Sequence, residues 1–133
     1  MNMILDASAA ITSMLKNEVS QKLKSYMDQA GWIISPDLYP AEVSNALCKY
    51  HRFNQYPLSV CFEMLDHAIG LVDEYVPTTT LYKECFSLSC SISHPVYDVF
   101  YLVLARRQNA TLVTLDKKLR ALASDLSIRC LSL

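Results

Sequence analysis

Short apolar runs alternate with longer segments of helical periodicity along the whole chain. The expected strands are residues 3–5, 32–35, 73–76, 110–115 and 127–131. The expected helices are residues 9–16, 18–30, 40–53, 57–71, 80–91, 95–107 and 116–124. Short strands that are apolar on both faces and separated by helices are typical of a parallel sheet covered on both sides. The pattern therefore predicts an α/β fold with a central parallel sheet of about five short strands.

Length and composition narrow the function classes. The 133 residues are enough for one domain, residues 1–133, and 52% hydrophobic with 19% charged residues excludes a disordered chain. The only glycines are Gly31 and Gly70, which excludes the glycine-rich loops that bind nucleotide phosphates. The net charge of -1 means that a nucleic-acid partner would need a local basic patch.

The cysteines and the N-terminal residues favour a protein of the cytoplasm. Five cysteines, an odd number, lie in apolar stretches without a paired metal-binding spacing, so we expect buried free thiols. The first residues carry no basic start and Asp6 interrupts their apolar run, so we expect no signal peptide. The apolar run 99–105 is too short to cross a bilayer, so no membrane association is expected.

Four acidic residues stand where a parallel sheet places its binding site. Asp6 follows the first expected strand, Asp116 follows the fourth, and Glu42 and Asp98 lie in the first turns of helices. Ligands of open parallel sheets bind beyond the carboxyl ends of the strands. Asp98 is the most informative of the four because its neighbours are almost all apolar, and an enclosed carboxylate is costly without a partner. We therefore expect one acidic crevice at this edge.

Each carboxylate also fits an ordinary structural role. Asp98 and Glu42 suit helix N-termini, Asp116 suits the cap of the following helix, and Asp6 suits a turn with Ser8. Such roles do not explain why four acids gather at one edge, where they repel each other. A hard divalent cation removes the repulsion, and Mg²⁺ prefers oxygen ligands, whereas Zn²⁺ prefers Cys and His.

Four blocks in this order resemble PIN-domain nucleases, most closely the VapC-type toxins of toxin–antitoxin pairs. The blocks are 4–8 (ILDAS), 40–47 (PAEVSNAL), 94–98 (HPVYD) with its apolar continuation to 105, and 110–116 (ATLVTLD) with Leu119 following. The third and fourth blocks together are specific, and the resemblance covers essentially the whole chain. Asn109 stands where many relatives have glycine, and asparagine tolerates a left-handed turn.

The resemblance implies a three-layer α/β/α sandwich with Mg²⁺- or Mn²⁺-dependent endoribonuclease activity. By position it makes Asp6, Glu42, Asp98 and Asp116 the catalytic and metal-binding acids, with Ser8 and Thr114 as supporting polar residues. It further implies a homodimer, an RNA substrate and a cognate antitoxin protein.

The basic, histidine and tyrosine residues fit different roles. Lys117 and Lys118 adjoin Asp116, and Lys49 and Arg52 share a helix face, so all four are candidates for RNA-phosphate contacts. Arg106, Arg107 and Arg120 fit either this role or ordinary solvated positions. His94 is expected to be a loop residue without a catalytic role, and Tyr97 and Tyr101 are expected to pack.

Three other function classes stay open. A phosphotransfer protein also places an aspartate after a strand, but the phosphatase pattern needs a second aspartate where Ser8 stands. A receiver domain needs a pair of acidic residues after its first strand, where this chain has Asp6 alone. A stand-alone PIN-domain nuclease in RNA processing and a non-catalytic interaction module on the same fold are the remaining alternatives. An antitoxin gene immediately upstream would favour the toxin.

Overall fold

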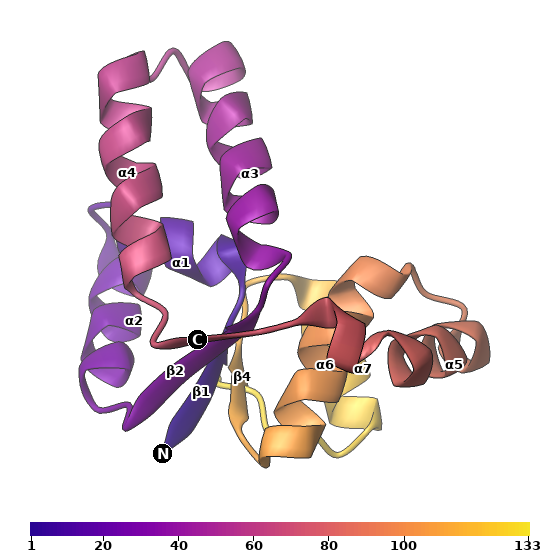
Figure 1. The fold of residues 1–133 in the computed structure, drawn as a ribbon. Coiled ribbons are helices and arrows are strands. Elements are labelled where there is room, and N and C mark those ends of the chain that lie inside the picture. The colour runs from indigo at the N-terminus through magenta and orange to yellow at the C-terminus, as the bar shows by residue number, and fades with distance from the viewer.

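The structure is a computed structural model that describes residues 1–133. Its centre is a parallel sheet of four strands in the order β3-β2-β1-β4 (Figure 1). The strands are β1 (Asn2–Leu5), β2 (Trp32–Pro36), β3 (Glu74–Val76) and β4 (Thr111–Val113). Ile4 of β1 is in register with Ile34 of β2 and with Leu112 of β4. All strands point the same way, so their carboxyl ends share one edge of the sheet.

Seven α-helices and one 3-10 turn connect and cover the strands. They are α1 (Ala7–Ser13), α2 (Glu18–Asp28), α3 (Tyr39–Asn54), α4 (Leu58–Gly70), the turn η1 (Thr78–Thr80), α5 (Tyr82–Ile92), α6 (Val96–Gln108) and α7 (Lys117–Asp125). Helices α1 to α4 lie on one side of the sheet and α5 to α7 on the other (Figure 1). The predicted α/β/α layering is confirmed.

Alternate residues of each strand supply the two hydrophobic cores. Met3 and Leu5 of β1 pack with α1 to α4, whereas Ile4 between them packs with α6 and α7. Successive side chains of a strand point to opposite faces, so one short strand contributes to both cores. Helix α6 is the most deeply placed helix, with every residue from Val99 to Ala105 buried.

The sheet has four strands, and the predicted fifth strand at 127–131 is wrong. Only Cys130 forms a bridge, with Leu112 of β4, through hydrogen bonds from Leu112 N to Arg129 O (2.8 Å) and from Leu131 N to Leu112 O (2.9 Å). Strand β4 is three residues long rather than the expected six, since the chain turns towards α7 at Thr114. Ser127 has a φ of 57°, which is incompatible with an extended strand there.

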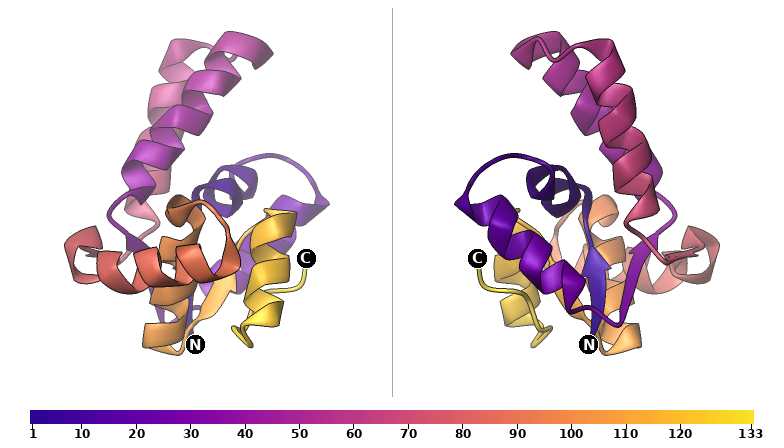
Figure 2. Two further views of the ribbon diagram at one scale, coloured as in Figure 1. Left: turned by 90° about the vertical axis from the view of Figure 1, so that its right-hand side faces the viewer. Right: turned by 90° about the vertical axis from the view of Figure 1, so that its left-hand side faces the viewer.

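The hairpin of α3 and α4 projects well beyond the rest of the molecule (Figure 2). Cys61 and Leu47 pack between the two helices. Apolar side chains also lie on its surface, and Phe53 is 71% and Phe62 59% exposed. The hairpin leaves the sheet at the carboxyl end of β2, so its first turn is the part that reaches the sheet edge.

Two expectations about single residues are corrected. All five cysteines are free, but Cys48 and Cys90 are exposed, because each lies on the solvent side of an amphipathic helix. Tyr97, expected to pack, is 66% exposed in the first turn of α6.

The tolerance of Asn109 for a left-handed turn is confirmed, since it ends α6 with a φ of 49°. No single helix is long and apolar enough to cross a membrane, and the pair α5 and α6, which reaches that length only together, is bent by 114°.

Candidate active site at the carboxyl edge of the sheet

Asp6 is the buried centre of the site. It ends β1 and caps α1, with Oδ1 accepting hydrogen bonds from Ala9 N (2.9 Å) and Ser8 Oγ (2.7 Å), while Oδ2 accepts from Thr114 Oγ1. Burial raises the pKa of Asp6 to about 6, the three hydrogen bonds oppose the rise, and the negative charge of Asp116 adds to it. The turn with Ser8 expected for Asp6 is present, and the same carboxylate lies at the sheet edge.

Ser8 and Thr114 connect Asp6 to the segment that follows β4. The Thr114 hydroxyl accepts a hydrogen bond from Asp116 N (3.0 Å), and Ser8 Oγ accepts one from Leu115 N (3.1 Å). Thr114 is fully buried, so its hydroxyl is shielded from water. The two hydroxyls therefore fix the position of Asp116 relative to Asp6, although the residues are far apart in the chain.

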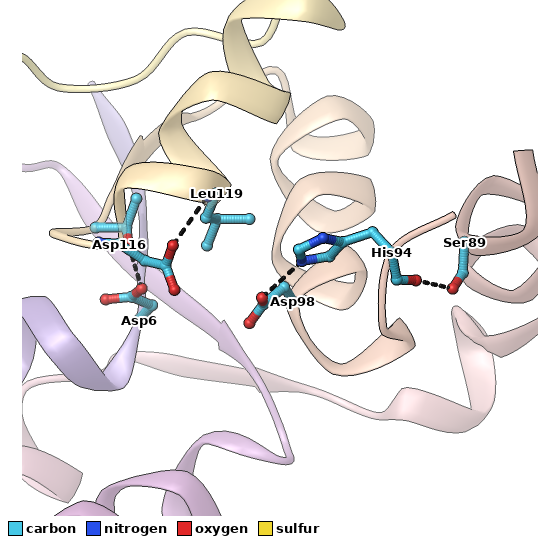
Figure 3. Close-up of polar contacts among 7 residues, drawn as sticks. Asp6, Ser89, His94, Asp98, Asp116 and Leu119 are labelled. Carbon is cyan, nitrogen blue, oxygen red and sulfur yellow. Dashed lines mark hydrogen bonds and ion pairs between the residues drawn. The ribbon is translucent and has the colours of Figure 1, made fainter. Parts of the chain in front are cut away.

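Asp116 lies at the surface beside Asp6 and opens α7 (Figure 3). Its Oδ1 accepts a hydrogen bond from Leu119 N at 3.0 Å, which is the helix cap that the sequence allowed. Its Oδ2 has no partner in the protein. A carboxylate with one oxygen in a cap and one oxygen free retains the ability to bind a ligand.

Glu42 reaches the edge from the first turn of α3. The hydroxyl of Tyr101, buried in α6, donates to Glu42 Oε1 at 2.6 Å. Burial raises the pKa of Glu42, the Tyr101 hydrogen bond opposes this, and the charges of Asp98 and Asp6 raise it further. Tyr101, expected only to pack, thus orients an acid of the site, and the pKa of its hydroxyl rises because of burial and the charge of Glu42.

Asp98 lies in the first turn of α6 but caps nothing. Its side chain is 33% exposed, so the expectation of an enclosed carboxylate is wrong, because the apolar residues after it face the core while Asp98 faces the sheet edge. Its Oδ2 contacts His94 Nε2 at 2.8 Å (Figure 3). This partner was missed in the sequence, although a spacing of four residues at a helix start is a signal for such a contact.

The four acids form a connected set of like charges at one edge. The negative charge of Asp116 raises the pKa of Asp6, and the charges of Asp98 and Asp6 raise the pKa of Glu42. As the side chains lie, no three Asp, Glu, His or Cys side chains are close enough to hold one metal ion. The donor set is nevertheless all oxygen, and Glu42, Asp98 and Asp116 each keep an oxygen without a hydrogen bond. These donors fit a hard divalent cation that retains water ligands.

The basic candidates divide into two groups by position. Lys117 and Lys118 are exposed directly beside Asp116. Lys49 and Arg52 lie on the projecting part of α3, about 10 Å and 15 Å along the helix axis from Glu42. The Arg52 guanidinium lies over the Phe53 ring, 5.2 Å from its centroid. Only the lysine pair adjoins the acids.

Arg106 and Arg107 lie at the opposite edge of the sheet, at the end of α6. Their guanidinium groups contact Glu84 Oε1 at 2.9 Å and Oε2 at 2.7 Å, and Arg107 also donates to the carbonyl of Thr80. This ion-pair cluster joins α5 to α6 and takes no part in the site.

The chain is similar to known proteins in sequence and in fold. No protein-family model matches the chain. A curated relative, ribonuclease VapC3 of Pyrobaculum aerophilum, is 28% identical over 124 residues, which are 90% of this chain and 92% of the relative. The crystal structure of the protein PAE2754 from Pyrobaculum aerophilum superposes with a TM-score of 0.71 and 20% identity, over 91% of this chain and 86% of that chain, which shows the shared fold. The resemblance to VapC-type PIN-domain proteins that the four sequence blocks indicated is thus confirmed.

Proposed function

We propose that this protein is a Mg²⁺- or Mn²⁺-dependent endoribonuclease and the toxin of a toxin–antitoxin pair. The observation that carries the proposal is the connected set of four carboxylates at the carboxyl edge of a parallel sheet. The relative named ribonuclease VapC3 supports RNA as the substrate class. Asp6, Glu42, Asp98 and Asp116 are the residues that would hold the metal.

The bound metal would supply an activated water and stabilisation of the leaving oxygen of a phosphodiester. The protein's own residues prepare the acids for it. Ser8 and Thr114 hold Asp6 by hydrogen bonds, and the Tyr101 hydroxyl holds Glu42. Such preorganisation reduces the rearrangement needed when substrate arrives.

Lys117 and Lys118 are proposed to bind a phosphate next to the scissile bond, since they are exposed beside Asp116. Cleavage would leave a 5′-phosphate and a 3′-hydroxyl. Lys49 and Arg52 lie farther from the acids along α3, so they are candidates only for contacts with a distant part of a long RNA.

A homodimer, a cognate antitoxin and a cytoplasmic location belong to the same proposal. Exposed apolar side chains favour assembly, among them Leu58 and Phe62 of α4, which line a hollow of about 180 Å³ with Leu47 and Leu65. An antitoxin gene directly upstream would support the pair, and its absence would favour the stand-alone nuclease.

The decisive experiment compares Asp98→Asn with Asp66→Asn in cleavage of a defined RNA. Asp66 is exposed on α4, away from the acids, and gives a matched loss of charge. We expect cleavage by the parent and by Asp66→Asn with Mg²⁺ or Mn²⁺, and none after chelation. We expect Asp98→Asn to lose about a thousandfold or more in rate, since metal-ion catalysis contributes several kcal/mol.

Two outcomes would contradict the proposal. Parent-rate cleavage by a folded Asp98→Asn protein would remove this carboxylate from the site. Absence of cleavage of all tested RNAs at saturating Mg²⁺ and Mn²⁺, combined with no metal binding by calorimetry, would favour a non-catalytic interaction module.

A further inference from the structure

His94 is the one histidine that contacts an acid of the candidate site. Its Nε2 lies 2.8 Å from Asp98 Oδ2, and its side chain is only 16% exposed. An ionised carboxylate only accepts hydrogen bonds, so the Nε2–H of His94 donates to Asp98. The bond takes one oxygen of Asp98 and leaves the other, Oδ1, without a partner.

The backbone around His94 is fixed by hydrogen bonds in a corner, the turn of residues 93–95 that joins α5 to α6. His94 N donates to the carbonyl of Ser89 at 3.3 Å, and Ser89 Oγ donates in return to the carbonyl of His94 (Figure 3). Ser93 takes a left-handed conformation with a φ of 53°, and Pro95 fixes the backbone at the start of α6. These contacts hold the imidazole against the first turn of α6.

The corner places the imidazole and the other acids on either side of Asp98. In Figure 3, His94 lies on one side of the Asp98 carboxylate, and Asp6 and Asp116 lie on the other. Asp98 has no cap interaction and is one-third exposed, so the hydrogen bond from His94 is the contact that restricts its rotation.

We propose that His94 is a positioning residue that holds the Asp98 carboxylate in the orientation needed to bind the divalent cation. The inference rests on the proposed function and adds a residue outside the acidic set. Groups that hydrogen-bond a metal-ligating side chain affect metal affinity strongly, and their loss costs about 10- to 100-fold. His94 would therefore act on metal affinity through Asp98 without contacting substrate.

The test measures binding of Mn²⁺ alone by isothermal titration calorimetry. His94→Leu removes the donor, His94→Gln keeps an N–H donor at similar reach, and His67→Leu is the matched control on the surface of α4. We expect His94→Leu to bind Mn²⁺ about 10- to 100-fold more weakly, with the parent affinity kept by His67→Leu and largely restored by His94→Gln. Ser89→Ala, which loosens the corner, should weaken binding in the same direction but less, and it serves if His94→Leu does not fold.

Cleavage kinetics provide the second readout. The Mg²⁺ concentration for half-maximal rate should rise in His94→Leu, while the rate at saturating Mg²⁺ falls by a smaller factor. A general loss of structure would not give this separation.

The outcomes separate the two proposals. If the parent binds Mn²⁺ and cleaves RNA but folded His94→Leu matches it, the role of His94 is refuted and the nuclease stands. If His94→Gln is as weak as His94→Leu, the ring fills space and does not position Asp98, which also refutes the inference. If the parent binds no Mn²⁺ and cleaves no RNA, the proposed function fails and the inference fails with it.

Discussion

Replacing Asp6 by asparagine tests whether the buried negative charge of Asp6 lowers the free energy of unfolding of the metal-free protein. Asparagine is nearly isosteric, and its amide oxygen can still accept from Ala9 N and Ser8 Oγ. Its NH₂ group would face Thr114 Oγ1, whose hydroxyl can rotate to accept. The substitution thus removes one charge and keeps the hydrogen-bonded frame that joins β1 to β4.

The magnitude follows from the raised pKa of Asp6. Its folded-state pKa of about 6 exceeds the ordinary value of 3.8, so the folded protein holds this proton more tightly than the unfolded chain does. The group's contribution to the free energy of unfolding is therefore complete below pH 3.8 and decreases as the pH rises towards 6. Above pH 6 the ionised carboxylate costs the folded state about 3 kcal/mol.

We therefore expect Asp6→Asn to raise the free energy of unfolding by about 3 kcal/mol at pH 8, with a Tm higher by roughly 10 °C. Most of the gain should disappear at pH 4. Urea unfolding of both proteins across this pH range, without metal, measures the difference, and Asp66→Asn serves as the exposed control. A stability difference that does not change with pH would refute the reasoning, because it would mean that the pKa of Asp6 is not raised.

Three further predictions test the site, the core and the assembly. Thr114→Val should lower the free energy of unfolding by about 2 kcal/mol at neutral pH, because Asp6 Oδ2 and the backbone N–H of Asp116 both lose the Thr114 hydroxyl as a hydrogen-bond partner. Urea unfolding of the variant measures the loss, and no loss would contradict the hydrogen bonds described. Leu104→Ala should cost about 2–5 kcal/mol in the same measurement, since Leu104 is 1% exposed in α6, and a loss below 1 kcal/mol would show that the core of α6 is loosely packed. Light scattering of the isolated protein at micromolar concentration should report a dimer, and a monomer would contradict the proposed assembly.

The order of strands and helices was readable from the sequence because it depends on local periodicity. Strand and helix patterns differ in their hydrophobic period, so the four observed strands and the helices were located within a few residues. The sequence also placed Asp6 and Asp116 at one sheet edge, since all parallel strands end on the same side. What it overestimated was the pairing at 127–131, where the left-handed Ser127 interrupts the extended backbone and only Cys130 pairs with Leu112.

Which atoms meet at the edge was decided by the tertiary structure alone. Thr114 reaches Asp6 across 108 positions of the chain, and Tyr101 reaches Glu42 across 59. No local pattern encodes these contacts, because they depend on how β4 and α6 dock against β1 and α3. The exposure of Asp98 was misjudged for the same reason. The apolar residues that follow it on the same helix face the core, whereas Asp98 faces the sheet edge. Neighbours in sequence fix the secondary structure, but burial and pKa depend on neighbours in space.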